Sequence, residues 1–179
     1  MNGLVRQAVK PLLNTTMIKK ILIGLAAVIA VFLIVAAMQP AAFRVSRSAT
    51  IAASPATLFE QINDLHKFQA WNPWAKIDPA SRITFTGPVS GVNAAYHWVG
   101  NAEVGEGSMT IIESKPAELV RARMDFMKPF AASYTAEFTL KPEADKTTVT
   151  WSLFGKNDFM SKAVKLVMHV DKMCGDQFE

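Results

Sequence analysis

The sequence has few residues of the kinds that metal sites and covalent catalysis require. Cys174 is the only cysteine among 179 residues, so the chain cannot form an internal disulfide. The three histidines, His66, His97 and His169, fall in no metal-ligand spacing such as His-x-His or His-Glu-x-x-His. A Gly-x-Ser-x-Gly nucleophile elbow is also missing. These absences predict a protein without a metal ion, without a cofactor and without a hydrolase triad.

Net charge is absent outside the first 20 residues. Arg6, Lys10, Lys19 and Lys20 give this basic stub, residues 1–20, four positive charges and no negative charge. The rest of the chain contains the other 15 lysines and arginines and all 15 aspartates and glutamates, so its formal charge is zero. Binding to nucleic-acid phosphates requires a surplus of positive charge, which this part of the chain lacks. We therefore expect no nucleic-acid partner.

Charged and strongly polar side chains are missing from Ile21 to Met38, a run of 18 residues. As a helix with a rise of about 1.5 Å per residue, this run is about 27 Å long, close to the thickness of a bilayer core. The basic stub before it predicts a single-pass protein of the inner membrane, with a cytoplasmic N-terminus and a periplasmic domain. Two other interpretations stay open, because Val35-Ala36-Ala37 is an acceptable cleavage site for a signal peptide and Met17 is an alternative start.

The residues after the apolar run predict one domain, 43–179, of a size that forms a single hydrophobic core. Phe43–Ile51 alternates like a strand. Ser54-Pro55 is a typical helix start, and apolar residues at helical spacing continue to Trp71 through two short helices. Asn72-Pro73 is expected to end the second helix, and a loop punctuated by Asp78-Pro79 follows.

From residue 82 to residue 153 the pattern changes to six strands separated by turn residues. Between Val120 and Phe126, for example, every second side chain is apolar and the others include two arginines and an aspartate. Such one-sided alternation predicts an antiparallel sheet with one apolar face and one face in water. From Lys162 to Glu179, polar side chains recur every three or four residues, which predicts a helix of about 20 residues that covers the apolar face.

These elements predict an α+β fold, in which a curved antiparallel sheet of about seven strands surrounds a long C-terminal helix, preceded by one transmembrane helix. The order and spacing of several short segments resemble the START-like, Bet v 1-like superfamily (SRPBCC), in particular bacterial polyketide cyclase/dehydrase-like proteins with an N-terminal membrane segment. Those segments include Ser54-Pro55-Ala56-Thr57-Leu58-Phe59, Trp71-Asn72-Pro73-Trp74, Tyr96-His97-Trp98 and Gly105-Glu106-Gly107-Ser108-Met109. The resemblance covers residues 43–179. It implies a helix-grip fold with a ligand pocket and no fixed catalytic motif, because the catalytic residues of the family vary between members.

A curved sheet with a helix laid across it is expected to leave an apolar cavity between the two. The candidate ligand-binding residues are the large apolar and aromatic side chains on or beside the apolar face: Trp71, Trp74, Tyr96, Trp98, Met109, Ile111, Met124, Phe126, Tyr134, Phe138 and Trp151. The alternative is that these side chains simply fill the core, as tryptophan and phenylalanine do in most proteins.

Acid–base catalysis would need a proton donor or acceptor placed inside the cavity. The alternation turns Asp125, Glu137 and His97 away from the apolar face, which leaves Tyr134 as the one weak catalytic candidate. Gly105-Glu106-Gly107 lacks the lysine of a phosphate loop and is expected to form a turn or a strand bulge.

The anchor, the one-sided sheet and the lack of buried acid–base residues together favour a membrane-anchored protein that binds a hydrophobic small molecule or a lipid. In this hypothesis residues 21–38 contact the membrane and the cavity lies between the sheet and the C-terminal helix. A polyketide cyclase or dehydratase that uses Tyr134 is the first alternative. A protein-interaction module with a solid core and no ligand is the second.

Overall fold

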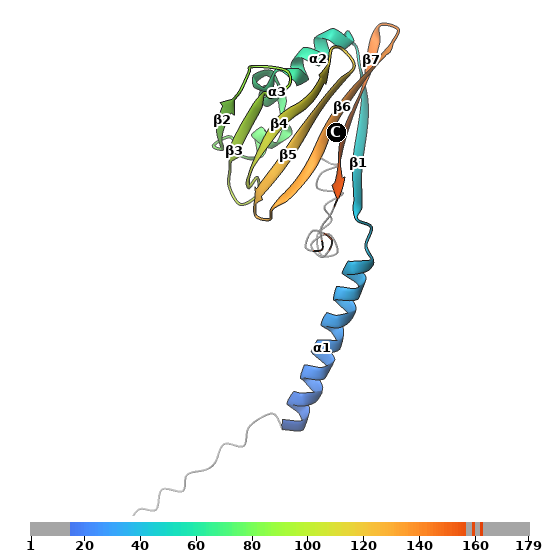
Figure 1. The fold of residues 1–179 in the computed structure, drawn as a ribbon, viewed down its shortest axis with the longest axis vertical. Helices are drawn as coiled ribbons and strands as arrows, with labels where there is room; N and C mark the ends of the chain where they lie inside the picture. The colour runs from blue at the N-terminus through green and yellow to red at the C-terminus, as the bar shows by residue number, and fades with distance from the viewer. Residues whose placement is uncertain (1–14, 157–158, 160–161, 163–179) are drawn as a thin grey trace, which may run out of the picture. The chain divides into compact units, whose positions relative to one another are not determined.

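A single antiparallel sheet of seven strands dominates the computed structural model, which describes residues 15–156, 159 and 162 (Figure 1). The chain forms two compact units, Met1–Gln39 and Pro40–Glu179. The first contains a long apolar helix, and the second contains the sheet with three short helices among the described residues.

Helix α1 (Thr15–Met38) contains the whole apolar run that begins at Ile21. Of the described helices it alone is long and apolar enough to cross a membrane. Its apolar side chains, such as those of Ile23 and Val28, are largely exposed, so this helix is not the core helix of a soluble domain. By length and composition, α1 fits a membrane span, a signal anchor or a signal sequence alike.

The seven strands occupy the positions that the alternation predicts. They lie in the order β1-β7-β6-β5-β4-β3-β2, and each is antiparallel to its neighbours, so β1 and β2 form the two edges. Their bounds are β1 (Ala42–Ile51), β2 (Arg82–Thr86), β3 (Ala95–Val99), β4 (Glu106–Lys115), β5 (Leu119–Lys128), β6 (Ala132–Glu143) and β7 (Lys146–Lys156). The prediction of an α+β fold with a curved antiparallel sheet of seven strands is confirmed.

Two short helices follow β1, as predicted. Helix α2 (Pro55–Asn63) begins at Ser54, whose side-chain oxygen accepts a hydrogen bond from the backbone N–H of Thr57 at 3.2 Å. Helix α3 (Leu65–Trp71) begins at Asp64, which accepts from the backbone N–H of His66 at 2.9 Å. Both are ordinary N-caps, in which a short polar side chain satisfies a backbone donor that has no partner in the first turn.

A third short helix, α4 (Pro73–Ile77), occupies the segment between Asn72 and Asp78, where a loop was expected. The expectation was wrong because Asn72 both ends helix α3 and begins helix α4. Its backbone N–H donates to the carbonyl of Phe68 at the end of α3, and its side-chain oxygen accepts from the N–H of Trp74 at 3.2 Å. Proline at the first position of α4 suits a helix start, because the N–H that it lacks would have no partner there.

Two register shifts bend β4 against β5. One lies between Ile111 and Glu113, so that Ile112 has no partner in the register and its side chain is 45% exposed. The other lies between Glu106 and Gly107, just after Gly105, which has a φ of 71°. The predicted turn or bulge at Gly105-Glu106-Gly107 is confirmed, and the conformation of Gly105 is one that other residues rarely adopt.

The main core lies on one face of the sheet, under α2 and α3 (Figure 1). We call the face that carries Tyr96, Ile111 and Phe138 the inner face, and the opposite one the outer face. Buried side chains of the two helices, among them Leu65 and Phe68, pack against these inner residues. The predicted C-terminal helix lies outside the described residues, except for Phe159 and Lys162, which are helical.

We expect Phe138→Ala to lower the free energy of unfolding by about 3–5 kcal/mol, the usual cost of removing a large core aromatic. Phe138 is 1% exposed, and its ring stacks on that of Trp151 with centroids 4.9 Å apart. Urea unfolding followed by tryptophan fluorescence measures the loss. The matched control is Thr139→Ala, the next residue of β6, which is exposed and should change little. Equal losses in the two variants would contradict this packing.

Candidate functional site: the inner face of the sheet

The inner face is apolar along the five central strands. Apart from Ser114, Pro142 and Thr147, its side chains in β3–β7 are aromatic, aliphatic, methionine, alanine or glycine. They include nine of the candidate ligand-binding residues: Tyr96, Trp98, Met109, Ile111, Met124, Phe126, Tyr134, Phe138 and Trp151. The other two candidates, Trp71 and Trp74, lie in α3 and α4. Strand alternation therefore places these nine side chains on one surface, as expected.

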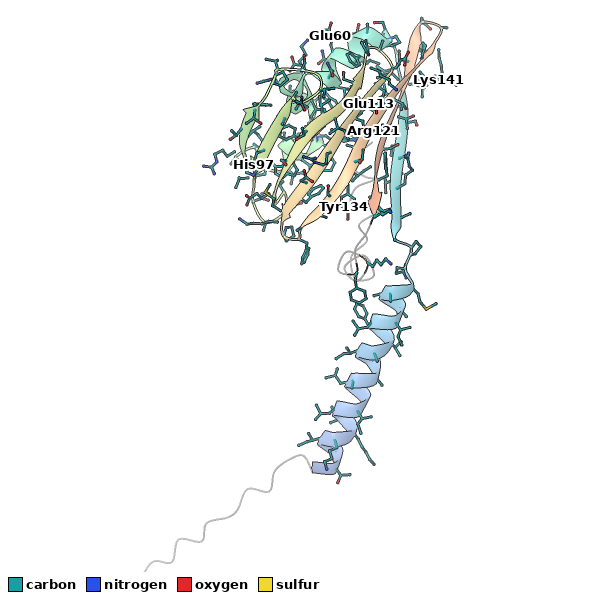
Figure 2. All side chains as sticks on the ribbon, in the orientation of Figure 1. Glu60, His97, Glu113, Arg121, Tyr134 and Lys141 are labelled. Atoms are coloured by element: carbon teal, nitrogen blue, oxygen red, sulfur yellow. The ribbon has the colours of Figure 1, made fainter. Side chains whose placement is uncertain are left out.

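Burial along this face is uneven. Met109, Ile111 and Phe138 are fully buried, in the same core as α2 and α3. Met124 and Phe126, further along β5, are only partly buried. Tyr134 is partly buried as well, and Figure 2 places it at the end of the sheet opposite Glu60 and Lys141. Phe43 and Trp98, at the same end as Tyr134, are buried, and Trp151, beside Phe138, is partly buried. The half-covered side chains Met124, Phe126 and Tyr134 therefore form a patch on an otherwise largely buried face.

One aromatic group joins the helices to the sheet. The Trp151 ring stacks on Phe138 and meets the edges of Trp71 and Trp74, with centroids 6.2 and 5.7 Å away. The Phe68 ring packs edge-on against Trp71 at 4.8 Å. Edge-to-face contacts of this kind stabilise aromatic pairs beyond the area that they bury. Four of the candidate residues therefore form one cluster.

A second aromatic group follows the other end of the inner face. Trp98 meets Phe126 edge-on at 5.7 Å, Phe126 contacts Tyr134 at 6.0 Å, and Tyr134 in turn contacts Phe43 of β1 at 5.4 Å. Met124 packs against the clusters at both ends. Its flexible thioether therefore packs both against the main core and against the smaller cluster of Phe43, Val45, Ala136 and Leu153.

Two of the candidate tryptophans have their N–H groups satisfied by the protein. The Trp71 indole donates to the carbonyl of Gln61 at 3.1 Å, and the Trp98 indole donates to the carbonyl of Val104 at 3.4 Å. These bonds fix the orientation of both rings, as expected of tryptophans with a structural role. For Trp71 and Trp98 the core interpretation is therefore at least as well supported as a ligand contact.

Two glycines that the sequence did not assign to the site make room for candidate side chains. A Cβ on Gly107 would lie 2.5 Å from the Trp98 ring, and a Cβ on Gly155 would lie 2.8 Å from the Tyr134 ring. Glycine inside a strand often marks such a close approach. Both occupy inner-face positions of an alternating strand, which is the signal that could have identified them.

Tyr96 provides a second phenol on the inner face besides Tyr134. Burial raises the pKa of the Tyr96 hydroxyl far above its usual value, and a hydrogen bond with the Asn72 side chain opposes this only in part. The phenol therefore keeps its proton at neutral pH and cannot act as a base. Its bond to Asn72 ties β3 to the start of α4.

Charged side chains of β3–β6 lie on the outer face, as the alternation predicts. Asp125 accepts from Arg123 at 2.8 Å and from Ser133 at 2.7 Å, and Glu137 pairs with Arg121. The apolar face therefore has no carboxylate from these two positions.

The outer face also holds His97, whose imidazole lies 3.5 Å from Glu106. The Lys128 ammonium lies 2.6 Å from the second oxygen of the same carboxylate. Among the described residues, no group of three or more His, Cys, Asp or Glu side chains is placed to hold a metal ion.

The family described as "Polyketide cyclase / dehydrase and lipid transport" matches residues 42–170. This range begins at the first residue of β1 and contains the whole sheet. No curated protein matches the chain.

Several solved structures share the fold. Protein Ms6760 from Mycobacterium smegmatis is 15% identical, with a TM-score of 0.51 over 75% of this chain and 85% of that one. The Aha1 dimer from Colwellia psychrerythraea is 15% identical, with a TM-score of 0.50 over 76% and 90% of the two chains. The major latex-like protein 151 of Panax ginseng is 11% identical, with a TM-score of 0.48 over 70% and 94%. At such low identity the likeness concerns the fold alone.

The ion pairs of the outer face predict a loss of stability in acid. The Lys115 ammonium, 3.0 Å away, and the Arg121 guanidinium hold the pKa of Glu113 below its usual value. A carboxylate whose pKa is lowered by folding stabilises the folded state above its unfolded pKa of about 4.3 and loses this effect as pH falls through the folded value. We expect Glu113→Gln to be less stable than the native chain at pH 7 and to lose that difference in acid.

Urea unfolding of both proteins between neutral and acidic pH measures this difference. In a Lys115→Met background, the loss of stability caused by Glu113→Gln at pH 7 should be smaller. The reason is that one of the two cations that lower the pKa of Glu113 has been removed. A difference that stayed constant with pH would show that Glu113 acts through packing and not through its charge.

Proposed function

Because the chain belongs to the family of polyketide cyclases, dehydrases and lipid-transport proteins, we propose that it binds a hydrophobic small molecule or a lipid on the inner face. In this proposal α1 anchors the protein in the inner membrane, with the N-terminus in the cytoplasm and the domain in the periplasm. The candidate ligand-binding residues of the sheet, together with Trp71 and Trp74, line the site.

The observation that carries the proposal is a half-covered patch of three side chains on a largely apolar face. Met124, Phe126 and Tyr134 are large side chains that keep part of their surface uncovered, although they continue the same face as the buried Phe138. Covering apolar surface gains about 25 cal/mol per Å². An apolar ligand that lies along this patch would gain that energy without displacing the packed core under α2 and α3.

The chemistry of the face favours an apolar ligand over a charged one. Asp125 and Glu137 are paired with arginines on the outer face, so they are not available to bind a cation on the inner face. The phenols and indoles of this face can hold one or two polar atoms of a mainly apolar molecule. The other polar inner-face side chains are Ser114, Thr147 and, on the edge strand β1, Arg47. We place this ligand between the sheet and the predicted C-terminal helix.

The anchor favours a membrane lipid as the source of the ligand. Three residues separate α1 from β1, so the domain stays close to the membrane that α1 crosses. A short tether keeps the local concentration of the binding site near the bilayer high. A ligand that is already dissolved in the membrane would then reach the site without crossing water over a long distance.

Catalysis by Tyr134 is the second candidate function. The family description includes cyclases and dehydrases, and the Tyr134 ring lies against Gly155 in the half-covered patch of the inner face. Tyr96, the other phenol, is fully buried and bound to Asn72. Tyr134 is thus the better placed of the two to contact a bound molecule.

We expect Met124→Gln to lower the retention of a bound apolar molecule about tenfold, because covering a methionine side chain gains about 1.5–3 kcal/mol. The full-length chain is released from membranes in mild detergent. Native mass spectrometry then measures the fraction of protein that retains a bound molecule, and lipid extraction recovers that molecule. Arg123→Gln is the matched control, with the same new residue one position earlier, on the outer face and exposed. Equal occupancy in both variants, or no bound molecule in the native chain, would favour an interaction module without a ligand.

Tyr134→Phe separates binding from catalysis. Phenylalanine keeps the ring contacts with Phe43 and Phe126 and removes the hydroxyl. We expect occupancy to be unchanged in native mass spectra, and the extracted molecule to have the same mass as in the native chain. A substrate that accumulates unchanged only in the variant would instead assign a catalytic role to the Tyr134 hydroxyl.

A further inference from the structure

The β5–β6 hairpin ends in a run of exposed side chains with little polar character. Residues 127–131, Met-Lys-Pro-Phe-Ala, are all exposed, and the large side chains of Met127 and Phe130 are 47% and 52% exposed. Single exposed apolar residues are common and mean little alone. Here Met127 lies near the end of β5 and Phe130 lies in the three-residue connection to β6, so both belong to the tip of one hairpin. The position of that tip in the fold suggests what they do.

The hairpin tip lies at the end of the sheet where the chain enters from α1. Phe43, Gly155 and Tyr134 form one row across β1, β7 and β6. Both β1 and β6 begin at this end of the sheet, where Figure 1 shows the β5–β6 turn. Phe130 precedes Tyr134 by four residues, and Met38, the last residue of α1, precedes Phe43 by five.

These spacings set similar upper limits on the distances of Phe130 and Met38 from the shared row. An extended strand advances about 3.3 Å per residue, so Phe130 lies within about 13 Å of the shared row and Met38 within about 17 Å of it. The greatest distance that Phe130 can have from this row is therefore similar to the greatest distance that Met38 can have from it. A bilayer crossed by α1 would have its surface within reach of Phe130.

We propose that the tip of the β5–β6 hairpin inserts Met127 and Phe130 into the interface of the bilayer that α1 crosses. This inference rests on the membrane-anchoring part of the proposed function. The partner is the layer between lipid headgroups and acyl chains, where apolar side chains of peripheral segments lie about 5–10 Å deep. Phenylalanine and methionine are suited to this layer, because both are apolar and methionine adapts to an irregular surface.

Apolar contact, and not attraction to anionic lipids, is the driving force in this proposal. Lys128, between the two apolar residues, is paired with Glu106 at 2.6 Å, and His97 lies 3.5 Å from the same carboxylate. The tip therefore presents no isolated positive charge to the membrane. Insertion should occur in zwitterionic lipid and change little with salt.

The insertion would also place the half-covered patch of the inner face beside the lipid. Phe126 pairs with Ala132 at the base of the hairpin, and Tyr134 follows two residues later. These are the side chains on which the proposed ligand lies. The hairpin would thus hold the ligand site at the surface from which a membrane lipid leaves.

The single cysteine of the chain makes a site-specific test possible. In a Cys174→Ser background, Phe130→Cys is labelled with the fluorophore NBD, and the full-length chain is reconstituted into phosphatidylcholine vesicles. Val89→Cys is the matched control, since Val89 is an apolar residue that is 61% exposed in the β2–β3 loop, at the other end of the strands. Thermal unfolding confirms that both labelled chains are folded.

Quenching by phosphatidylcholine that carries a spin label on its acyl chain reports the depth of each fluorophore. At a depth of about 5–10 Å, NBD at position 130 should lose about half of its emission, whereas NBD at position 89 should lose almost none. Equal quenching at the two positions would overturn the proposal. Quenching at position 130 that required added phosphatidylglycerol would also overturn it, because the driving force would then be electrostatic.

Flotation of the same vesicles shows whether the membrane anchor or only the docking of the hairpin is wrong. If the chain does not float with them after a carbonate wash, both the membrane anchor and the docking of the hairpin are wrong. If the chain floats but NBD at position 130 stays unquenched, the docking of the hairpin alone is wrong.

Discussion

The fold depends on the strict alternation of apolar and charged side chains along the central strands. Because neighbours on a strand point to opposite faces, a slip of one residue would turn a whole apolar row into water. Phe138 opposite Trp151 fixes the register of β6 and β7 on the inner face. On the outer face, the ion pairs of Arg121 with Glu113 and Glu137 require the matching register of β4, β5 and β6. Both faces therefore specify the same arrangement of strands.

Strand positions and the first two short helices were predictable because their signals are local. Alternation identifies a strand without knowledge of its neighbours, and Ser54-Pro55 identifies a helix start from two residues. Helix α4 was not predictable in this way. Asn72-Pro73 is a typical helix end, and only the folded chain shows that the Asn72 side chain also caps a new helix. The bulge at Ile112 was equally hidden, since it depends on how β4 pairs with β5.

For the candidate site, the alternation in the sequence could show which face of the sheet a residue lies on. It could not show which side chains contact one another. Trp71 and Trp74 meet Trp151 only because α3 and α4 fold back onto a strand far along the chain. The role of Gly107 and Gly155 depends on the rings that lie opposite them, which requires the register of the sheet. Which side chains touch is a tertiary property, and a single sequence has no direct signal for it.

The uneven burial of the inner face bears on both parts of the proposed function, the ligand and the anchor. Helices α2 and α3 close the core around Ile111 and Phe138, so an apolar molecule could enter there only by displacing packed side chains. At the other end, Phe126 and Tyr134 are partly covered, and β1 joins the sheet three residues after α1. If α1 crosses a membrane, as proposed, the direction of β1 decides at which end of the face the chain continues toward that membrane. If β1 ran the other way, the short tether would hold the closed end of the core at the bilayer and the half-covered aromatic residues away from it.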